Sequence, residues 1–133
     1  MVPDFVARIH AGIFSRWRSI GYAAHGLGLL VSQEPNARLH LFATLAVVIA
    51  GAFAGLSLEE WRWIALACGL VWAAESFNTA IERLCDRICP TRDPLIGAAK
   101  DFAAGAVLVT ALVAAAIGIS VFAPHFPIAA PQQ

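Results

Sequence analysis

Three long apolar stretches constrain this chain more than any other feature of its sequence. They cover residues 39–56, 63–81 and 102–123, and each is close to the roughly 20 residues that a helix needs to cross a bilayer. Backbone groups find no water to bond inside the hydrocarbon, and three segments cannot close a barrel, so each stretch is expected to be helical. The sequence therefore predicts an all-α membrane protein with three transmembrane helices.

The composition agrees with this prediction. Of the 133 residues, 59% are hydrophobic and 14% are charged, against about 25% charged residues in ordinary soluble domains. Nine Lys and Arg balance nine Asp and Glu, which disfavours nucleic acid as a partner. The spans use most of the length, so we expect one integral-membrane domain over residues 1–123. Residues 124–133 lack a helical pattern and are expected to form a flexible tail.

The residues before the first stretch predict interfacial helices over residues 4–31. Apolar side chains recur every four residues from position 5 to position 17, with arginines on the other faces. This pattern is typical of an amphipathic helix that lies in the membrane interface. A second helical stretch is expected from about residue 19, before Pro35 marks a break. Polar residues interrupt the first dozen positions, so we expect no signal peptide there.

The positions of the basic residues predict the orientation. Four precede the first span and four lie between the second and third spans, whereas only Arg62 lies in the remaining connection. Because cytoplasmic loops carry the excess of Lys and Arg, the N-terminus is expected in the cytoplasm and the C-terminus outside.

The second span carries the polar residues that chemistry would use. At about 100° per residue, Glu75, Glu82 and Asp86 fall within about 40° of one another, and Asn78 lies about 60° to one side. Glu75 is expected inside the hydrocarbon near its cytoplasmic border, with Glu82 and Asp86 at the water interface. A carboxylate within the membrane is costly and usually marks a proton, ion or substrate site. The alternative for Glu75, and more so for Asn78, is hydrogen bonding between helices without chemistry.

A divalent cation would relieve the repulsion among these carboxylates. Hard oxygen ligands suit Mg²⁺, and Glu34 is expected at the same cytoplasmic level. Lys100 and Asp101 begin the third span there, where a helix N-terminus favours anions such as phosphate. The chain contains no Walker A motif. The residues alone thus predict a site for a metal and phosphate on the cytoplasmic side, and they do not name the reaction.

Two runs of sequence resemble a known family. They are Glu75-Ser-Phe-Asn78-Thr-Ala-Ile-Glu82 followed by Asp86, and Ala99-Lys100-Asp101-Phe-Ala-Ala-Gly105-Ala-Val-Leu108. Both resemble the signature of the prokaryotic diacylglycerol kinase family of integral-membrane lipid kinases. The resemblance extends upstream through Gly21-Tyr22, Glu34 and Asn36-Ala-Arg38-Leu-His40, and covers about residues 14–122. Three features are more similar to the undecaprenol kinase branch than to the enterobacterial diacylglycerol kinase branch: the Asn36-Ala-Arg38-Leu-His40 stretch, Glu60-Trp61 and Pro94-Leu95.

The resemblance implies an activity and a set of roles. It implies transfer of the γ-phosphate of Mg-ATP to the hydroxyl of a membrane lipid alcohol, undecaprenol rather than diacylglycerol. Glu75 would be the general base, with Asn78 beside it, and Glu34 and Glu82 would hold Mg²⁺. The nucleotide would be bound by Arg16, Tyr22, Glu34, Glu82, Asp86, Thr91, Arg92, Asp93, Lys100 and Asp101. The lipid headgroup would approach Glu75 and Ala104.

The resemblance also implies an assembly and a location. The family forms homotrimers with active sites shared between adjacent subunits, in the bacterial inner membrane. Independently of the resemblance, three helices make too thin a bundle to shield Glu75 from lipid, so the sequence itself predicts an oligomer.

Other functions stay open from the sequence. One is a diacylglycerol kinase that makes phosphatidic acid. Another is an oligomeric transporter or channel in which Glu75 cycles a proton or binds a cation, although the external halves of the spans offer few polar residues beyond Thr44, Cys68 and Ser120. A third, a structural assembly subunit, leaves the charged cluster unexplained.

Overall fold

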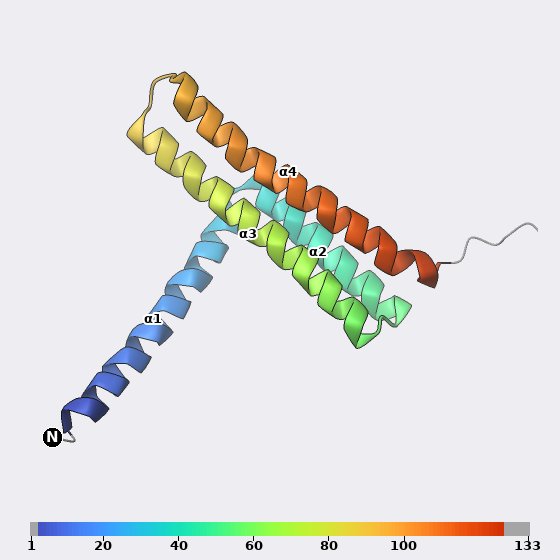
Figure 1. The fold of residues 1–133 in the computed structure, drawn as a ribbon, viewed down its shortest axis with the longest axis horizontal. Coiled ribbons are helices and arrows are strands. Elements are labelled where there is room, and N and C mark those ends of the chain that lie inside the picture. The colour runs from blue at the N-terminus through green and yellow to red at the C-terminus, as the bar shows by residue number, and fades with distance from the viewer. Residues whose placement is uncertain (1–2, 127–133) are drawn as a thin grey trace, which may run out of the picture. The chain divides into compact units, whose positions relative to one another are not determined.

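The computed structural model describes residues 3–126 of the chain, with side chains from residue 17 onward. The elements are α1 (Pro3–Gln33), α2 (Pro35–Ala54), α3 (Leu58–Ile88), α4 (Pro94–Phe122) and the 3₁₀ helix η1 (Ala123–His125) (Figure 1). No strand occurs within the described range, which confirms the predicted all-α class. Helices α2, α3 and α4 are long and apolar enough to cross a membrane, as predicted.

Helix α1 belongs to a compact unit of its own, which ends at Glu34. It is one continuous helix where the sequence pattern predicts two successive stretches. No proline occurs between Pro3 and Pro35 to interrupt it, whereas Pro35 disfavours helical backbone at the residue before it. Most of its described side chains are exposed, including Trp17 and Tyr22.

The second unit contains α2, α3 and α4, with α3 packed against α4 over most of its length (Figure 1). The buried side chains of α3 recur every three or four residues, which is the spacing of one helical face. They are Ile64, Ala67, Val71, Glu75, Asn78, Thr79 and Cys85. Helices α2 and α4 each bury only two described residues. The face of α3 that forms the apolar core therefore also carries the polar residues predicted to form the site.

Side-chain caps fix where α3 and α4 begin. The Ser57 side chain accepts a hydrogen bond from the Glu60 backbone N–H, and the Glu60 carboxylate accepts one from the Ser57 N–H at 2.7 Å, which forms a capping box. At the other end of the bundle, Asp93 Oδ1 accepts hydrogen bonds from the N–H groups of Leu95 and Ile96, with Pro94 in the first turn of α4. The second cap sets the register of α4 beside the last turns of α3.

The chain continues past α4 as η1, over residues that the sequence predicts to belong to a flexible tail. The ring of His125 lies 2.8 Å from Glu60 Oε1, so the end of α4 is joined to the start of α3. Residues 127–133 of the predicted tail lie outside the described part of the chain.

Gly51 lies on α2 where a larger residue would collide with the connection to α3. A Cβ at this position would lie 2.8 Å from Trp61 Cη2 and 2.9 Å from Leu56 Cδ1. We expect Gly51→Ala to lower the free energy of unfolding by about 1–3 kcal/mol, because both side chains must leave their packed positions. Thermal unfolding in detergent measures this. Gly118→Ala is the matched control, because its Cβ would have nothing within 4 Å; equal midpoints for the two variants would contradict the prediction.

Candidate functional site

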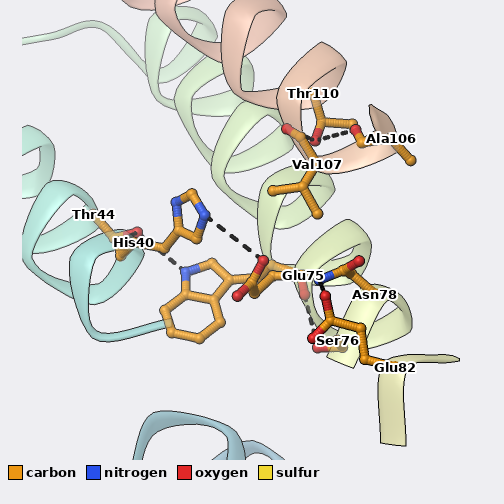
Figure 2. A network of polar contacts seen from close by, with 10 residues as sticks. His40, Thr44, Glu75, Ser76, Asn78, Glu82, Ala106, Val107 and Thr110 are labelled. Atoms are coloured by element: carbon orange, nitrogen blue, oxygen red, sulfur yellow. Dashed lines mark hydrogen bonds and ion pairs between the residues drawn. The ribbon is translucent and has the colours of Figure 1, made fainter. Parts of the chain in front are cut away.

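Polar side chains occupy three successive levels along α3, from the exposed Asp86 through the half-buried Glu82 to the buried Asn78 and Glu75. Asp86 lies near the C-terminal end of α3, and Asn78 and Glu82 lie one to two turns earlier. Figure 2 shows Glu82, Asn78 and Glu75, of which Glu75 is the most deeply buried. At a rise of about 1.5 Å per residue, Asp86 and Glu75 are about 16 Å apart along the helix axis. These polar residues therefore extend from the end of the bundle where α3 and α4 are joined into the apolar interior of the bundle.

The first level joins the ends of α3 and α4. Lys100 Nζ donates a hydrogen bond to Asp86 Oδ1 at 2.8 Å. The loop between the helices forms a hollow of about 510 Å³ beside this pair. Its lining residues are Asp86, Cys89, Pro90, Thr91, Arg92, Asp93, Pro94, Ile96, Gly97 and Lys100. The structure thus brings five of the predicted nucleotide-binding residues to one place.

The second level holds two oxygen-bearing side chains. Asn78 Nδ2 donates to Glu82 Oε1 at 3.3 Å. The other end of the amide, Asn78 Oδ1, is buried and has no hydrogen-bond partner within the described part of the chain. These are hard oxygen donors of the kind that Mg²⁺ prefers. No group of three His, Cys, Asp or Glu residues that could hold a metal ion occurs among residues whose placement is described.

The third level is the buried carboxylate. The side chain of Glu75 is 2% exposed, and His40 Nε2 of α2 lies 4.0 Å from Glu75 Oε2. A single chain therefore already shields this carboxylate, so the expectation that three helices are too thin to do so was wrong. One turn further along α2, Thr44 Oγ1 donates to the carbonyl of His40 at 2.7 Å and accepts a hydrogen bond from Trp72 Nε1 at 3.1 Å. Figure 2 shows His40 and Thr44 on α2 reaching toward the α3 residues. These contacts join α2 to α3 at the depth of the carboxylate.

The remaining predicted residues belong to α4 or to the unit that contains α1. Asp101 and Ala104 are exposed on α4. Tyr22 and Glu34 belong to the unit that contains α1, where the Tyr22 hydroxyl lies 3.5 Å from Arg18 Nη2. The side chain of Arg16 lies outside the described part of the chain.

Sequence reasoning gave no role to His40, Thr44 or Trp72. A signal for His40 was present, because it is the only ionisable residue within the apolar stretch 39–56. The sequence holds no comparable signal for the contact between Trp72 and Thr44. An indole in one span and a threonine hydroxyl in another could each pair with many other residues.

The chain is similar to known proteins over most of its length. Residues 21–122 match the family described as prokaryotic diacylglycerol kinase. The chain is 40% identical over 108 residues to the undecaprenol kinase of Bacillus subtilis, covering 81% of this chain and 88% of the relative. It is 35% identical over 101 residues to a diacylglycerol kinase of Synechocystis sp., covering 75% of this chain and 58% of that relative.

The family match covers more than half of the chain, including all three levels of the site from His40 to Lys100. Both relatives are kinases that carry the name of a lipid alcohol. The chain therefore belongs to the prokaryotic diacylglycerol kinase family and is a phosphotransferase with an alcohol acceptor.

Proposed function

We propose that the protein transfers the γ-phosphate of Mg-ATP to the hydroxyl of a membrane lipid alcohol, with undecaprenol as the preferred acceptor. The observation that carries the proposal is the buried Glu75 carboxylate, 2% exposed, on the same face of α3 as Glu82 and Asp86. A lipid hydroxyl lies at the border of the hydrocarbon and ATP arrives from water, so the two substrates approach this face from opposite ends.

Glu75 is proposed as the general base. Its carboxylate takes the proton of the lipid hydroxyl while the hydroxyl oxygen forms a bond to the γ-phosphorus of ATP. The bond between that phosphorus and the oxygen bridging to the β-phosphate breaks, and ADP leaves with the bridging oxygen. Transfer of this kind depends mainly on positioning and on neutralising phosphate charge. Asn78, one turn from Glu75 and also buried, is proposed to help position the reacting groups.

The other two levels are proposed to bind the nucleotide. Glu82 and Glu34 would hold Mg²⁺, which when bound neutralises charge on the phosphates. Lys100 places a cation beside the hollow formed by the loop, and its side chain is 35% exposed, so it remains accessible to a phosphate. The further nucleotide contacts proposed are Arg16, Tyr22, Asp86, Thr91, Arg92, Asp93 and Asp101, and Ala104 is proposed to lie against the lipid headgroup.

The protein is proposed to work as a homotrimer in the bacterial inner membrane. Large apolar side chains are exposed along α2 and α4, among them Leu39, Phe42, Phe53, Phe102, Leu108 and Ile119, and lipid or further copies of the chain would cover them. Helix α1 is proposed to lie in the membrane interface. The N-terminus of the chain is proposed to be cytoplasmic and its C-terminus to lie on the opposite side of the membrane. This orientation brings the loop between α3 and α4, with Arg92 in the loop and Arg83, Arg87 and Lys100 in the adjoining helix ends, to the side that supplies ATP.

The preference for undecaprenol rests on the higher identity and coverage of the Bacillus relative. We expect the purified protein in detergent to transfer labelled γ-phosphate from Mg-ATP to undecaprenol, and to do so faster than to diacylglycerol when both are offered together. The faster acceptor is identified by separating the labelled lipids. A preference for diacylglycerol would overturn the choice of lipid and make phosphatidic acid the product. Transfer to neither lipid by a folded oligomer would overturn the kinase proposal and favour a transporter that uses Glu75.

A further inference from the structure

Glu75 is buried among apolar helices, where an ionised carboxylate is expensive unless a positive or N–H-bearing group accompanies it. Helix α2 brings His40 to this position: its side chain is 18% exposed and its Nε2 lies 4.0 Å from Glu75 Oε2. The cation of Lys100, on α4, lies at the other end of the site, where its Nζ contacts Asp86 of α3 at 2.8 Å. The carboxylate thus has a basic side chain of its own, from a different helix.

The backbone of α2 at His40 is connected to α3 through the Thr44 hydroxyl. The His40 carbonyl accepts a hydrogen bond from Thr44 Oγ1 at 2.7 Å, and the same hydroxyl accepts a hydrogen bond from Trp72 Nε1 of α3 at 3.1 Å. Trp72 precedes Glu75 by three residues, about one helical turn. Since α2 and α3 are tied together one turn from the pair, the imidazole and the carboxylate are kept at the same depth.

We propose that His40 is a positioning residue for Glu75, a role that rests on the proposed function of Glu75 as the base. At 4.0 Å the imidazole Nε2 and Oε2 are further apart than a hydrogen bond, so the imidazole acts on the carboxylate electrostatically: it favours one orientation toward the hydroxyl of the lipid and stabilises the charge in the apolar interior. His40 lies on the far side of Glu75 from the level of Glu82, so it acts on the base and leaves nucleotide binding unaffected.

Three substitutions distinguish this role from simple packing. The amide nitrogen of glutamine reaches the place of Nε2, that of asparagine reaches only the place of Nδ1, and leucine offers no donor. We expect His40→Leu and His40→Asn to lower kcat by about 10-fold to 100-fold, and His40→Gln to restore most of the loss. The KM for Mg-ATP should stay within about twofold of the wild type in all three variants, because only the transition state loses an interaction.

His125→Leu is the matched control, because His125 also lies against a glutamate, Glu60, at 2.8 Å, but at the opposite end of the bundle. It should leave kcat unchanged. A His40→Leu variant with wild-type kcat, a His40→Gln variant no better than His40→Leu, or an equal loss of kcat in His125→Leu would each overturn the proposal.

A measurement that does not depend on activity separates this inference from the proposed function. The thermal midpoints of His40→Leu, Glu75→Gln and the double variant should be non-additive, because either single change already removes the electrostatic part of the interaction between the imidazole and the charged carboxylate. Additive midpoints would overturn the pairing of His40 with Glu75. A wild-type protein that phosphorylates no lipid alcohol, with non-additive midpoints, would instead overturn the kinase proposal and with it the positioning role, while the pair itself would stand.

Discussion

Replacing Glu75 with glutamine should lower phosphate transfer by about 10² to 10⁴-fold, the contribution expected of a general base. Glutamine has the size and shape of glutamate but cannot take the hydroxyl proton. The same change removes a buried charge from a side chain that is 2% exposed, so the thermal midpoint in detergent should be equal to or higher than that of the wild type. Initial rates with saturating Mg-ATP and lipid alcohol, measured beside the midpoint, test both expectations.

Glu59→Gln provides the control for this variant. Glu59 lies in the first turn of the same helix, at the opposite end from the site, and is exposed. The substitution should leave the rate unchanged. Turnover at the wild-type level in Glu75→Gln would sink the assignment of the base, whereas a lower midpoint would indicate that the carboxylate stabilises the fold and that lost activity reflects lost structure.

The sequence predicted the three spans because each apolar run is long enough to cross a bilayer and must then be helical. The helix that contains the second span is longer than the span itself: α3 covers Leu58–Ile88, whereas the predicted span is 63–81. Hydropathy falls where polar residues begin, but backbone hydrogen bonds continue through Glu82 and Asp86 until the chain leaves the helix. The residues from Ser57 to Glu60 have the sequence pattern of a capping box, and this pattern marks the start of α3 at Leu58.

For the site, helical spacing predicted that Glu75, Glu82 and Asp86 share one face, because residues on one helix have a fixed angular relation. Contacts between helices could not be predicted from the sequence. The approach of His40 to Glu75 and of Lys100 to Asp86 depends on how far one helix is shifted along another, which the packing of small and apolar side chains decides. A pattern within one helix carries no information about that shift.

Glu82 is the residue through which the metal prediction can be tested most directly. Its carboxylate is held by Asn78 at 3.3 Å, and the unbonded Asn78 Oδ1 supplies a second hard oxygen at the same level. We expect Glu82→Ala to raise the Mg²⁺ concentration needed for half-maximal transfer by about tenfold or more, which corresponds to about 1.4 kcal/mol or more of binding free energy. A kinetic titration with Mg²⁺ at fixed ATP measures this.

The size of this effect depends on how many ligands the protein contributes. Mg²⁺ bound together with a nucleotide usually takes one or two protein carboxylates and completes its coordination with phosphate oxygens and water, so the loss of one carboxylate would remove a large share of the protein's own hold on the ion. The variant should therefore bind ATP more weakly when Mg²⁺ is present and with unchanged affinity when Mg²⁺ is chelated. Glu59→Ala, on the same helix but at its other end, should change neither quantity. An unchanged Mg²⁺ requirement in Glu82→Ala would exclude Glu82 as a ligand and leave its contact with Asn78 as its only role at this level.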